Sequence, residues 1–291
     1  MKSRTKNLLE IHLAVLLFGL TGIFGKSVNL PARYITLGRV IFATLSMGIF
    51  FILKKKKIAL EKKSDYAALA FLGVLLAIHW TTFYVSIQMS TVAIGLLAFS
   101  SYPIFVTFLE PLIFREKLKL RDVLYAFIMF AGVLIIVPEF NIANNTTLGL
   151  LWGIVCALSY AVLSMLNRKF VSNYDGQMIA FYEQGTAAIL LMPMLLFYRP
   201  AVTAKDMGLL VLLGVVFTGV AHSLFISGMK EVRAQTAGII ASLETVYGII
   251  SAAILLGEIP PLREIVGGVV LLGTALCSTL NSSKENSVAN N

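Results

Sequence analysis

Charged side chains are scarce in this chain, and that scarcity is the first indication of its class. Asp, Glu, Lys and Arg make up 13% of the 291 residues, whereas a typical soluble domain carries about 25%. The only two cysteines, Cys156 and Cys277, both lie inside apolar runs, and the chain has only three histidines. A disulfide framework and a cysteine-based zinc site are therefore excluded. We expect no bound metal and no cofactor.

Apolar residues take the place of the missing charge. They make up 58% of the chain, and the mean hydropathy is +0.85. Apolar runs long enough to cross a bilayer, about 20 residues each, recur from one end to the other. The composition predicts an all-α polytopic protein of a bacterial-type cytoplasmic membrane. The N-terminal stretch has a basic head like a signal peptide, but no small-residue cleavage motif follows, so we expect a retained first helix.

Ten spans fit the apolar runs, with short connections between them. The expected spans are Leu8–Gly25, Ala32–Leu53, Tyr66–Ile87, Thr91–Phe114, Leu120–Val137, Leu148–Phe170, Met178–Tyr198, Met207–Met229, Ala234–Leu256 and Leu262–Leu280. The longest connections are "KKKKIALEKKSD" and "PEFNIANNTT", so no soluble domain is expected. The polar tail at 282–291 is expected to be disordered.

The formal net charge of +9 is distributed unevenly over the connections. With the N-terminus inside, 18 Lys and Arg residues fall on the inner side and five on the outer side, and Arg39 lies within a span. Because Lys and Arg collect in cytoplasmic loops, both termini are predicted to be cytoplasmic. No basic segment is long enough to fold around a nucleic acid, so no nucleic-acid partner is expected.

The two halves of the chain repeat each other. His79 precedes Gly95 by 16 residues, and His222 precedes Gly238 by 16 residues. "EKLKLRD", which begins at Glu116, matches "EIPPLRE" at the start of the last span. Five spans is an odd number, so the halves would insert with opposite orientation. This pattern predicts a 5+5 inverted-topology repeat, common in transporters, with halves 1–140 and 141–281.

Four further stretches are distinctive: "LLFGLTGIFGK", "RYITLGRVIFA", "FLEPLIFREKLKLRDVLYAFIMFAGVLII" and, in the second half, "IISAAILLGEIPPLREIVGGVVLLGTAL". In these stretches the sequence resembles the EamA-type family of the drug/metabolite transporter superfamily. The resemblance covers about residues 8–280. The resemblance implies a carrier with a central cavity between its halves. It also implies a substrate among amino acids, nucleosides, related metabolites or drugs, more often exported than imported.

Ionisable side chains inside spans are the main site candidates, because placing a charge in lipid costs about 2.5–3.5 kcal/mol on insertion scales. These candidates are Arg39, His79, Glu183, His222 and Glu244. His79 and His222 occupy equivalent repeat positions, toward opposite faces of the membrane. They are candidates for proton or solute contacts, or for hydrogen bonds that tie helices together.

Arg39 and Glu183 are also partners in the repeat. Arg39 is a candidate anchor for a substrate carboxylate or phosphate. The alternative that we favour is a structural ion pair with Glu183 or Glu244, or contact with carbonyl groups at a broken helix. Glu183 has the same two options as Arg39.

Glu244 is the sharpest candidate, because no basic residue lies near it in the sequence. It could carry a coupled proton or bind a substrate amino group. Pro103 frees a backbone carbonyl in the matching region of the first half, where Tyr102 is a candidate cavity residue. Trp80 is a candidate cation–π partner. Tyr84 and Trp152, near span ends, fit the interfacial aromatic belt instead.

The function predicted from the sequence is secondary transport of a small polar metabolite by alternating access, directed outward. Membrane lipid, a small-molecule substrate and candidate coupling protons are the expected partners, and the chain is expected as a monomer or homodimer. A proton-coupled importer of a small organic solute is the alternative. A membrane enzyme is a remote third reading, because no paired-carboxylate, nucleophile-elbow or phosphate-loop motif is present. We therefore expect no catalytic residues.

Overall fold

The computed structural model describes residues 2–114, 118–137, 141, 143–170, 173–228, 240–241 and 243–289. Within these residues the regular structure is entirely helical. The helices are α1 (Lys2–Lys26), α2 (Ala32–Leu53), α3 (Lys63–Met89), α4 (Val92–Phe99), α5 (Tyr102–Phe114), α6 (Leu120–Ile136), α7 (Asn145–Phe170), α8 (Gly176–Leu191), α9 (Met194–Phe197), α10 (Ala204–Gly214), the π-helix η1 (Val215–Val220), α11 (Ala221–Gly228), α13 (Leu243–Leu256) and α14 (Leu262–Ala289).

Local sequence explains where several of these helices start and stop. Thr203 and Asp206 form a capping box at the start of α10, each side chain accepting a hydrogen bond from the other residue's backbone N–H. The Thr91 hydroxyl accepts a hydrogen bond from the N–H of Ile94 at the start of α4. Pro193 has no N–H to continue α8, which ends at Leu191.

The observed helices match the expected spans, with an informative difference in two of them. The expected span Thr91–Phe114 is interrupted at Ser100 and Ser101, between α4 and α5. The span Met207–Met229 contains a π-helical stretch, and its last residue lies outside the described residues, as do 234–239 and 242 of the next span. Two members of the repeat pattern, Glu116 and Gly238, also lie outside them.

The polar tail differs from the prediction. α14 continues to Ala289, so most of the segment expected to be disordered is helical. Residues 281–289 contain no glycine or proline, and they include alanine, lysine and glutamate, which are good helix formers. The composition of the tail therefore permits the helix to run on.

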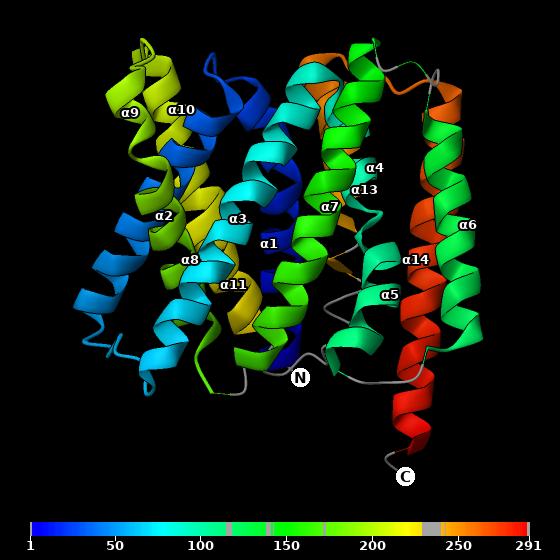
Figure 1. Cartoon of the computed structure of the whole chain (residues 1–291), viewed down its shortest axis with the longest axis horizontal. Helices are drawn as coiled ribbons and strands as arrows, with labels where there is room; N and C mark the ends of the chain where they lie inside the picture. The colour runs from blue at the N-terminus through cyan, green and yellow to red at the C-terminus, as the bar shows by residue number, and fades with distance from the viewer. Residues whose placement is uncertain are drawn as a thin grey trace.

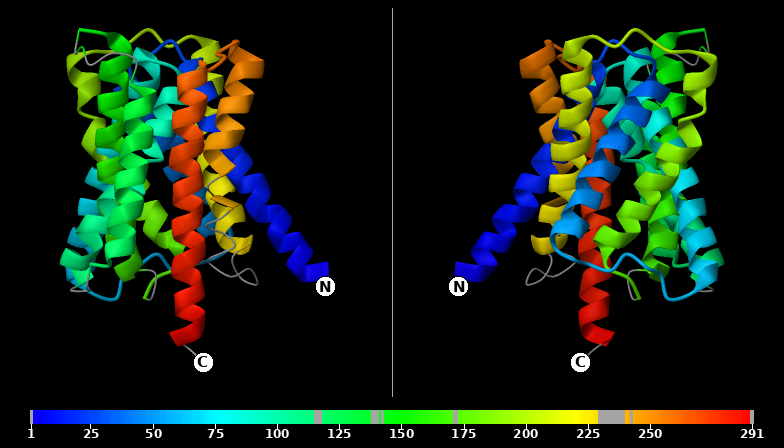
Figure 2. Two further views of the ribbon diagram at one scale, coloured as in Figure 1. Left: turned by 90° about the vertical axis from the view of Figure 1, so that its right-hand side faces the viewer. Right: turned by 90° about the vertical axis from the view of Figure 1, so that its left-hand side faces the viewer.

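The helices stand side by side as a bundle, and α1 begins at the same end of the bundle as α14 finishes (Figures 1 and 2). α3 packs along α7 and α8, whereas α1 packs along α11 and α13. α2 contacts α8 and α10, and α6 contacts α14. Every one of these pairs joins helices that are far apart in the chain.

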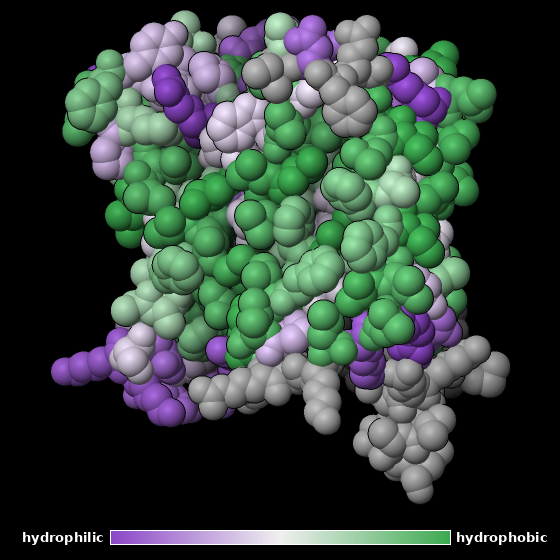
Figure 3. Space-filling view, turned by 45° about the vertical axis from the view of Figure 1, so that its right-hand side comes forward, coloured by the Kyte–Doolittle hydropathy of each residue, from purple (hydrophilic) through white to green (hydrophobic). Residues whose placement is uncertain are grey.

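An apolar belt surrounds the bundle. Figure 3 shows hydrophobic side chains over the middle of the molecule and hydrophilic ones gathered at its two ends. Among the residues that the structure describes, eight helical segments are long and apolar enough to span a membrane, and α13 is a shorter apolar helix. The chain is therefore a polytopic α-helical membrane protein, as the composition predicted.

Candidate functional site

Arg39 lies at the centre of a contact between three helical segments. It is 0% exposed. Its Nε donates to the Thr218 hydroxyl on η1 at 2.7 Å, and its Nη1 donates to the Tyr84 hydroxyl on α3 at 2.9 Å. Its Cζ lies 3.3 Å from the centre of the Trp80 ring. Arg39 is thus solvated by hydroxyl groups and an aromatic face.

The ion pair considered for Arg39 is not formed. No carboxylate of the described residues lies within 4.0 Å of its guanidinium group. Glu183 lies on α8 and is 6% exposed, and its carboxyl group interacts with Asn167 on α7 instead. The reason is the packing: α3 and η1 occupy the sides of Arg39, and they bring hydroxyl groups rather than an acid.

Two buried N–H groups in this cluster have no hydrogen-bond partner among the described residues. They are Nη2 of Arg39 and Nε1 of Trp80. A buried donor without a partner costs about 1–3 kcal/mol, and more where the donor is charged. The guanidinium fork matches a planar anion such as a carboxylate. These donors are therefore suited to an anionic group of a bound solute.

The π-helix explains how Thr218 reaches Arg39. In η1 the Thr218 hydroxyl donates to the carbonyl of Leu213, five residues earlier, at 2.9 Å. That bond leaves a lone pair of the hydroxyl oxygen for the Arg39 N–H. π-helical turns inside α-helices are rare and occur often at functional sites.

His79 is anchored in the interface of α3 and α7. It is 5% exposed, and its Nδ1 lies 3.2 Å from the carbonyl oxygen of Cys156. Its ring packs against the rings of Trp80, Phe99 and Tyr160, with centroids 5.1 to 5.4 Å away. One of its ring nitrogens thus has the helix-tying role that was the structural alternative. The proposed contact of His79 with a proton or a solute stays a prediction.

His222 lies in the interface of α11 and α1. It is half-buried, and its ring centroid is 5.1 Å from that of Phe18. No ring contact joins it to His79 within the described part of the chain. Their proposed pairing across one pathway stays a prediction.

Glu244 and Tyr102 line one cavity of about 310 Å³. It lies between the break that separates α4 from α5, the middle of α7, and helices α13 and α14. The rings of Tyr102 and Tyr160 meet edge to face at 5.1 Å. Glu244 has no hydrogen-bond or ion-pair partner among the described residues, although its charge and that of Arg39 act on each other.

The break between α4 and α5 forms one wall of this cavity. The N–H of Ser101 bonds the carbonyl of Ala98 at 3.1 Å, which closes a tight turn three residues before Ile104. The Ser100 and Thr245 hydroxyls share a hydrogen bond of 2.7 Å, joining the break to α13. The prediction that Pro103 marks irregular backbone at a cavity is consistent with this geometry.

Sequence reasoning missed two residues of the site. Tyr84 was assigned to the interfacial belt, yet it is 0% exposed and accepts a hydrogen bond from Arg39. Its position four residues after Trp80 puts both rings on one face of α3, and this spacing could have indicated that Tyr84 faces the same interior as Trp80. Thr218 had no such signal, because its partner lies 179 residues away. Trp152, by contrast, is 42% exposed, as a belt residue should be.

Comparisons with known proteins agree with this architecture. The EamA-like transporter family model matches twice, over residues 6–137 and 147–280. The transporter YxxF of Bacillus subtilis (strain 168) is 26% identical over 99% of this chain and 94% of its own length. A transporter of Archaeoglobus fulgidus is 27% identical over 91% of this chain and 93% of its own length.

A more distant relative carries a substrate in its name. The S-adenosylmethionine uptake transporter of Rickettsia conorii is 22% identical over 70% of this chain and 68% of its own length. One crystal structure of a protein has a TM-score of 0.67 at 16% identity and covers 96% of this chain and 98% of that chain, which supports the fold. The two family matches together span nearly the whole chain. The chain belongs to the EamA-like transporter family and is a multi-pass protein of the cell membrane.

Proposed function

We propose that this protein exports small amphoteric metabolites, amino acids in the first place, by alternating access. One observation carries the proposal: two opposite charges in the interior lack a directly contacting counter-ion. Arg39 has no carboxylate partner among the described residues, and Glu244 has no basic one. A solute with both a carboxylate and an ammonium group would satisfy both. The aromatic rings of Tyr102 and Trp80 add favourable faces for a cation.

The architecture that we propose for this task is ten spans in a 5+5 inverted repeat, with halves 1–140 and 141–281. The double match to the family model supports it. Helix packing supports it as well. α3 packs on α7 as α11 packs on α1, and α4 and α5 pack on α7 as α13 packs on α1. Helices at equivalent places in two related halves would make such reciprocal contacts.

The two histidines fit the same relation. His79 lies in the α3–α7 interface, and His222 lies in the reciprocal α11–α1 interface. Both termini would be cytoplasmic, because that orientation puts the lysine-rich connection after α2 on the inner side. We propose that His79, His222 and Glu183 position the helices around the solute and do not contact it directly.

Uptake is the second candidate. The observation that favours it is the group of relatives named S-adenosylmethionine uptake transporters. A sulfonium compound with an amino-acid end would place its carboxylate at Arg39 and its cationic centre near Glu244 and the Tyr102 ring. In either direction Glu244 is the group that we propose as the carrier of a coupled proton. Transport by the family and by its named relatives supports a carrier rather than a membrane enzyme.

Reconstitution of the purified protein in proteoliposomes tests these proposals. A panel of radiolabelled amino acids, nucleosides and S-adenosylmethionine would be measured for exchange and for accumulation driven by an imposed pH gradient. We expect exchange of amino acids with both charged groups, and competition only by compounds that retain the carboxylate. If no solute of the panel moves while a lipid is turned over, the carrier proposal is overturned.

A pair of matched variants separates binding from proton coupling. Glu244→Gln should abolish accumulation driven by the pH gradient and leave part of the exchange intact. Glu10→Gln, which changes a carboxylate in the N-terminal part of α1 that pairs with Lys6, should leave both intact. Normal accumulation by Glu244→Gln would remove Glu244 as the proton carrier. Wild-type rates in both His79→Ala and His222→Ala would remove the histidine pair from the pathway.

A further inference from the structure

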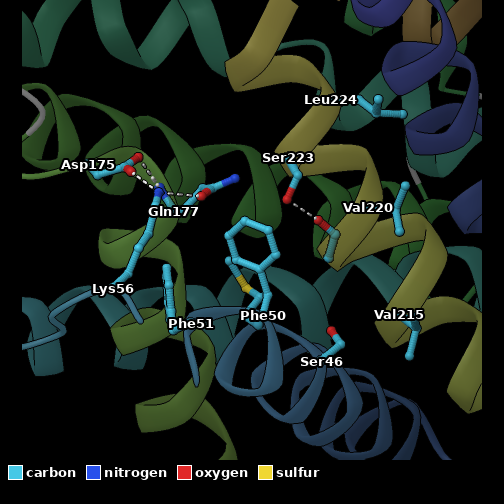
Figure 4. A pocket seen from close by; sticks show the side chains of 12 residues that line it. Ser46, Phe50, Phe51, Lys56, Asp175, Gln177, Val215, Val220, Ser223 and Leu224 are labelled. Carbon is cyan, nitrogen blue, oxygen red and sulfur yellow. Dashed lines mark hydrogen bonds and ion pairs between the residues drawn. The ribbon is translucent and has the colours of Figure 1, made fainter. Parts of the chain in front are cut away.

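A second cavity, larger than the one at Glu244, lies between α2 and the η1–α11 segment, with the start of α8 beside it. It has a volume of about 660 Å³, within the range of about 300–1,000 Å³ that small-molecule pockets occupy. Figure 4 shows Lys56, Asp175 and Gln177 together at one end of it, with Val215 and Val220 across from Phe50. We call this cavity the α2–α11 groove.

The groove exists because two helices cross closely and then separate. At the crossing, a Cβ atom on Gly214 would lie 2.7 Å from the carbonyl oxygen of Arg39, and one on Gly219 would lie 2.7 Å from the Ser46 hydroxyl. After η1 the chain continues as α11, which does not pack as closely on α2 as η1 does. Phe51 meets Phe181 of α8 edge to face at 5.4 Å, which closes the groove on that side.

The walls of the groove are apolar and open toward the lipid. Phe50, Met47, Val215 and Leu224 line it, and its wall residue Val220 is 43% exposed. The two hydroxyl groups in the walls are already bonded to their own helices, Ser46 to the Ala43 carbonyl and Ser223 to the Gly219 carbonyl. The interior of the groove therefore favours an occupant with an apolar surface. An acyl chain meets that condition, whereas a polar solute would lose its hydration there.

The end of the groove carries excess positive charge. Lys56 pairs with Asp175 at 2.9 Å and also donates to the Gln177 side chain at 3.2 Å. Lys54, Lys55 and Lys57 beside it are exposed and make no ion pair with any described residue. An apolar groove that opens to the bilayer and ends in uncompensated lysines is complementary to one chemistry, an acyl chain attached to an anionic head group.

We infer that the α2–α11 groove binds an anionic phospholipid of the membrane leaflet. One acyl chain lies between α2 and α11, and the phosphate contacts the lysines at 54–57. The bound lipid fills the space between the diverging helices, and it links α2 to α11 as protein contacts do elsewhere in the bundle. This site is separate from the cavity at Glu244, so it does not depend on what the protein transports.

Native mass spectrometry of the purified protein tests this inference directly. The protein in detergent micelles would be titrated with dioleoylphosphatidylglycerol or with dioleoylphosphatidylcholine, which differ only in the head group. We expect one phosphatidylglycerol to bind at least about tenfold more tightly than phosphatidylcholine, because several lysines contribute to holding its charge. Equal affinity for the two lipids would overturn the anionic part of the proposal.

Two matched pairs of variants locate the site. Val220→Trp should fill the groove and abolish retention of both lipids, whereas Val211→Trp, at a similarly exposed position of α10 outside the groove, should not. Replacing Lys54, Lys55 and Lys57 by Gln should lower phosphatidylglycerol binding to the phosphatidylcholine level. Replacing Arg199, Lys205 and Arg263, exposed residues of other connections, removes the same charge and should change nothing.

The outcomes that overturn the site are distinct. Equal lipid retention in Val220→Trp and Val211→Trp would mean that lipid binds elsewhere. If the lysine set and its control reduce binding equally, only net charge matters. A lipid-independent dimer that Val220→Trp breaks would assign the groove to a second copy of the chain. If Val220→Trp fails to fold by circular dichroism, the lysine set, which changes only exposed residues, still decides the question.

Discussion

Glu258 ties together three segments at the end of the bundle opposite the start of α1. Its Oε1 lies 2.5 Å from Lys26 Nζ at the end of α1, and its Oε2 accepts the Val92 N–H at the start of α4 at 2.8 Å. Lys26 also donates to the Ser90 carbonyl at 2.8 Å. The two charged side chains are only 24% and 17% exposed. We predict that this pair contributes measurably to stability.

The magnitude follows from the contacts. A hydrogen bond to a charged group contributes about 1.5–3 kcal/mol, and partial exposure favours the lower part of that range. We therefore expect a coupling free energy of about 1–2 kcal/mol between Lys26 and Glu258 in a double-mutant cycle. Glu258→Ala alone should cost about 2–3 kcal/mol, because Val92 loses its acceptor as well. Glu258→Gln, which can still accept that bond, should cost less.

Unfolding in mixed micelles with a rising fraction of sodium dodecyl sulfate, followed by circular dichroism, measures these free energies. Lys6 and Glu10 provide the control, because their pair at 3.7 Å has one side chain that is 75% exposed. Its coupling should be about 0.3–0.5 kcal/mol, as for other exposed pairs one helical turn apart. If Lys26 and Glu258 couple no more strongly than Lys6 and Glu10, the reasoning from burial is wrong.

Two further predictions concern the interior. A Cβ atom added at Gly25 would overlap the ring of Tyr84, whereas one at Gly208 would meet nothing within 4 Å. Gly25→Ala should therefore lower the free energy of unfolding by about 1–3 kcal/mol, and Gly208→Ala should raise it by about 0.4–1 kcal/mol. Equal effects of the two substitutions in the same micelle titration would contradict this packing. Arg39→Lys keeps the charge but loses the planar stack on Trp80. Exchange of carboxylate-bearing solutes in proteoliposomes should therefore fall at least about tenfold. Unchanged exchange would show that transport does not depend on the shape of the guanidinium group.

Much of the fold could be predicted from the sequence, because membrane insertion depends on properties that are local along the chain. The length of an apolar run decides whether it can cross the bilayer, and α2 begins and ends where its run was expected to. In the span Thr91–Phe114, the length of the run did not reveal that the helix is interrupted, although Pro103 indicated irregular backbone. There the helix is broken at Ser100 and Ser101, two residues before Pro103, although most of the run is apolar.

The candidate site was predicted only in part. The sequence identified Arg39 and Glu244 as ionisable groups within spans and Tyr102 as a candidate cavity residue, and the structure places Glu244 and Tyr102 on one cavity. The sequence-based assignment of Tyr84 to the interfacial belt was wrong, because the distance of a residue from a span end does not reveal which way its ring points. The ion pair favoured for Arg39 was also wrong: repeat symmetry relates Arg39 to Glu183 without bringing them together.

The sequence by itself therefore determined that this chain spans a membrane, which stretches are helical, and where ionisable groups enter the apolar interior. Composition and periodicity carry that information, since each depends on neighbouring residues. Only the tertiary structure decided what those groups contact. Arg39 finds its partners 45 and 179 residues away, on α3 and η1, because a buried guanidinium binds whatever groups helix packing places beside it.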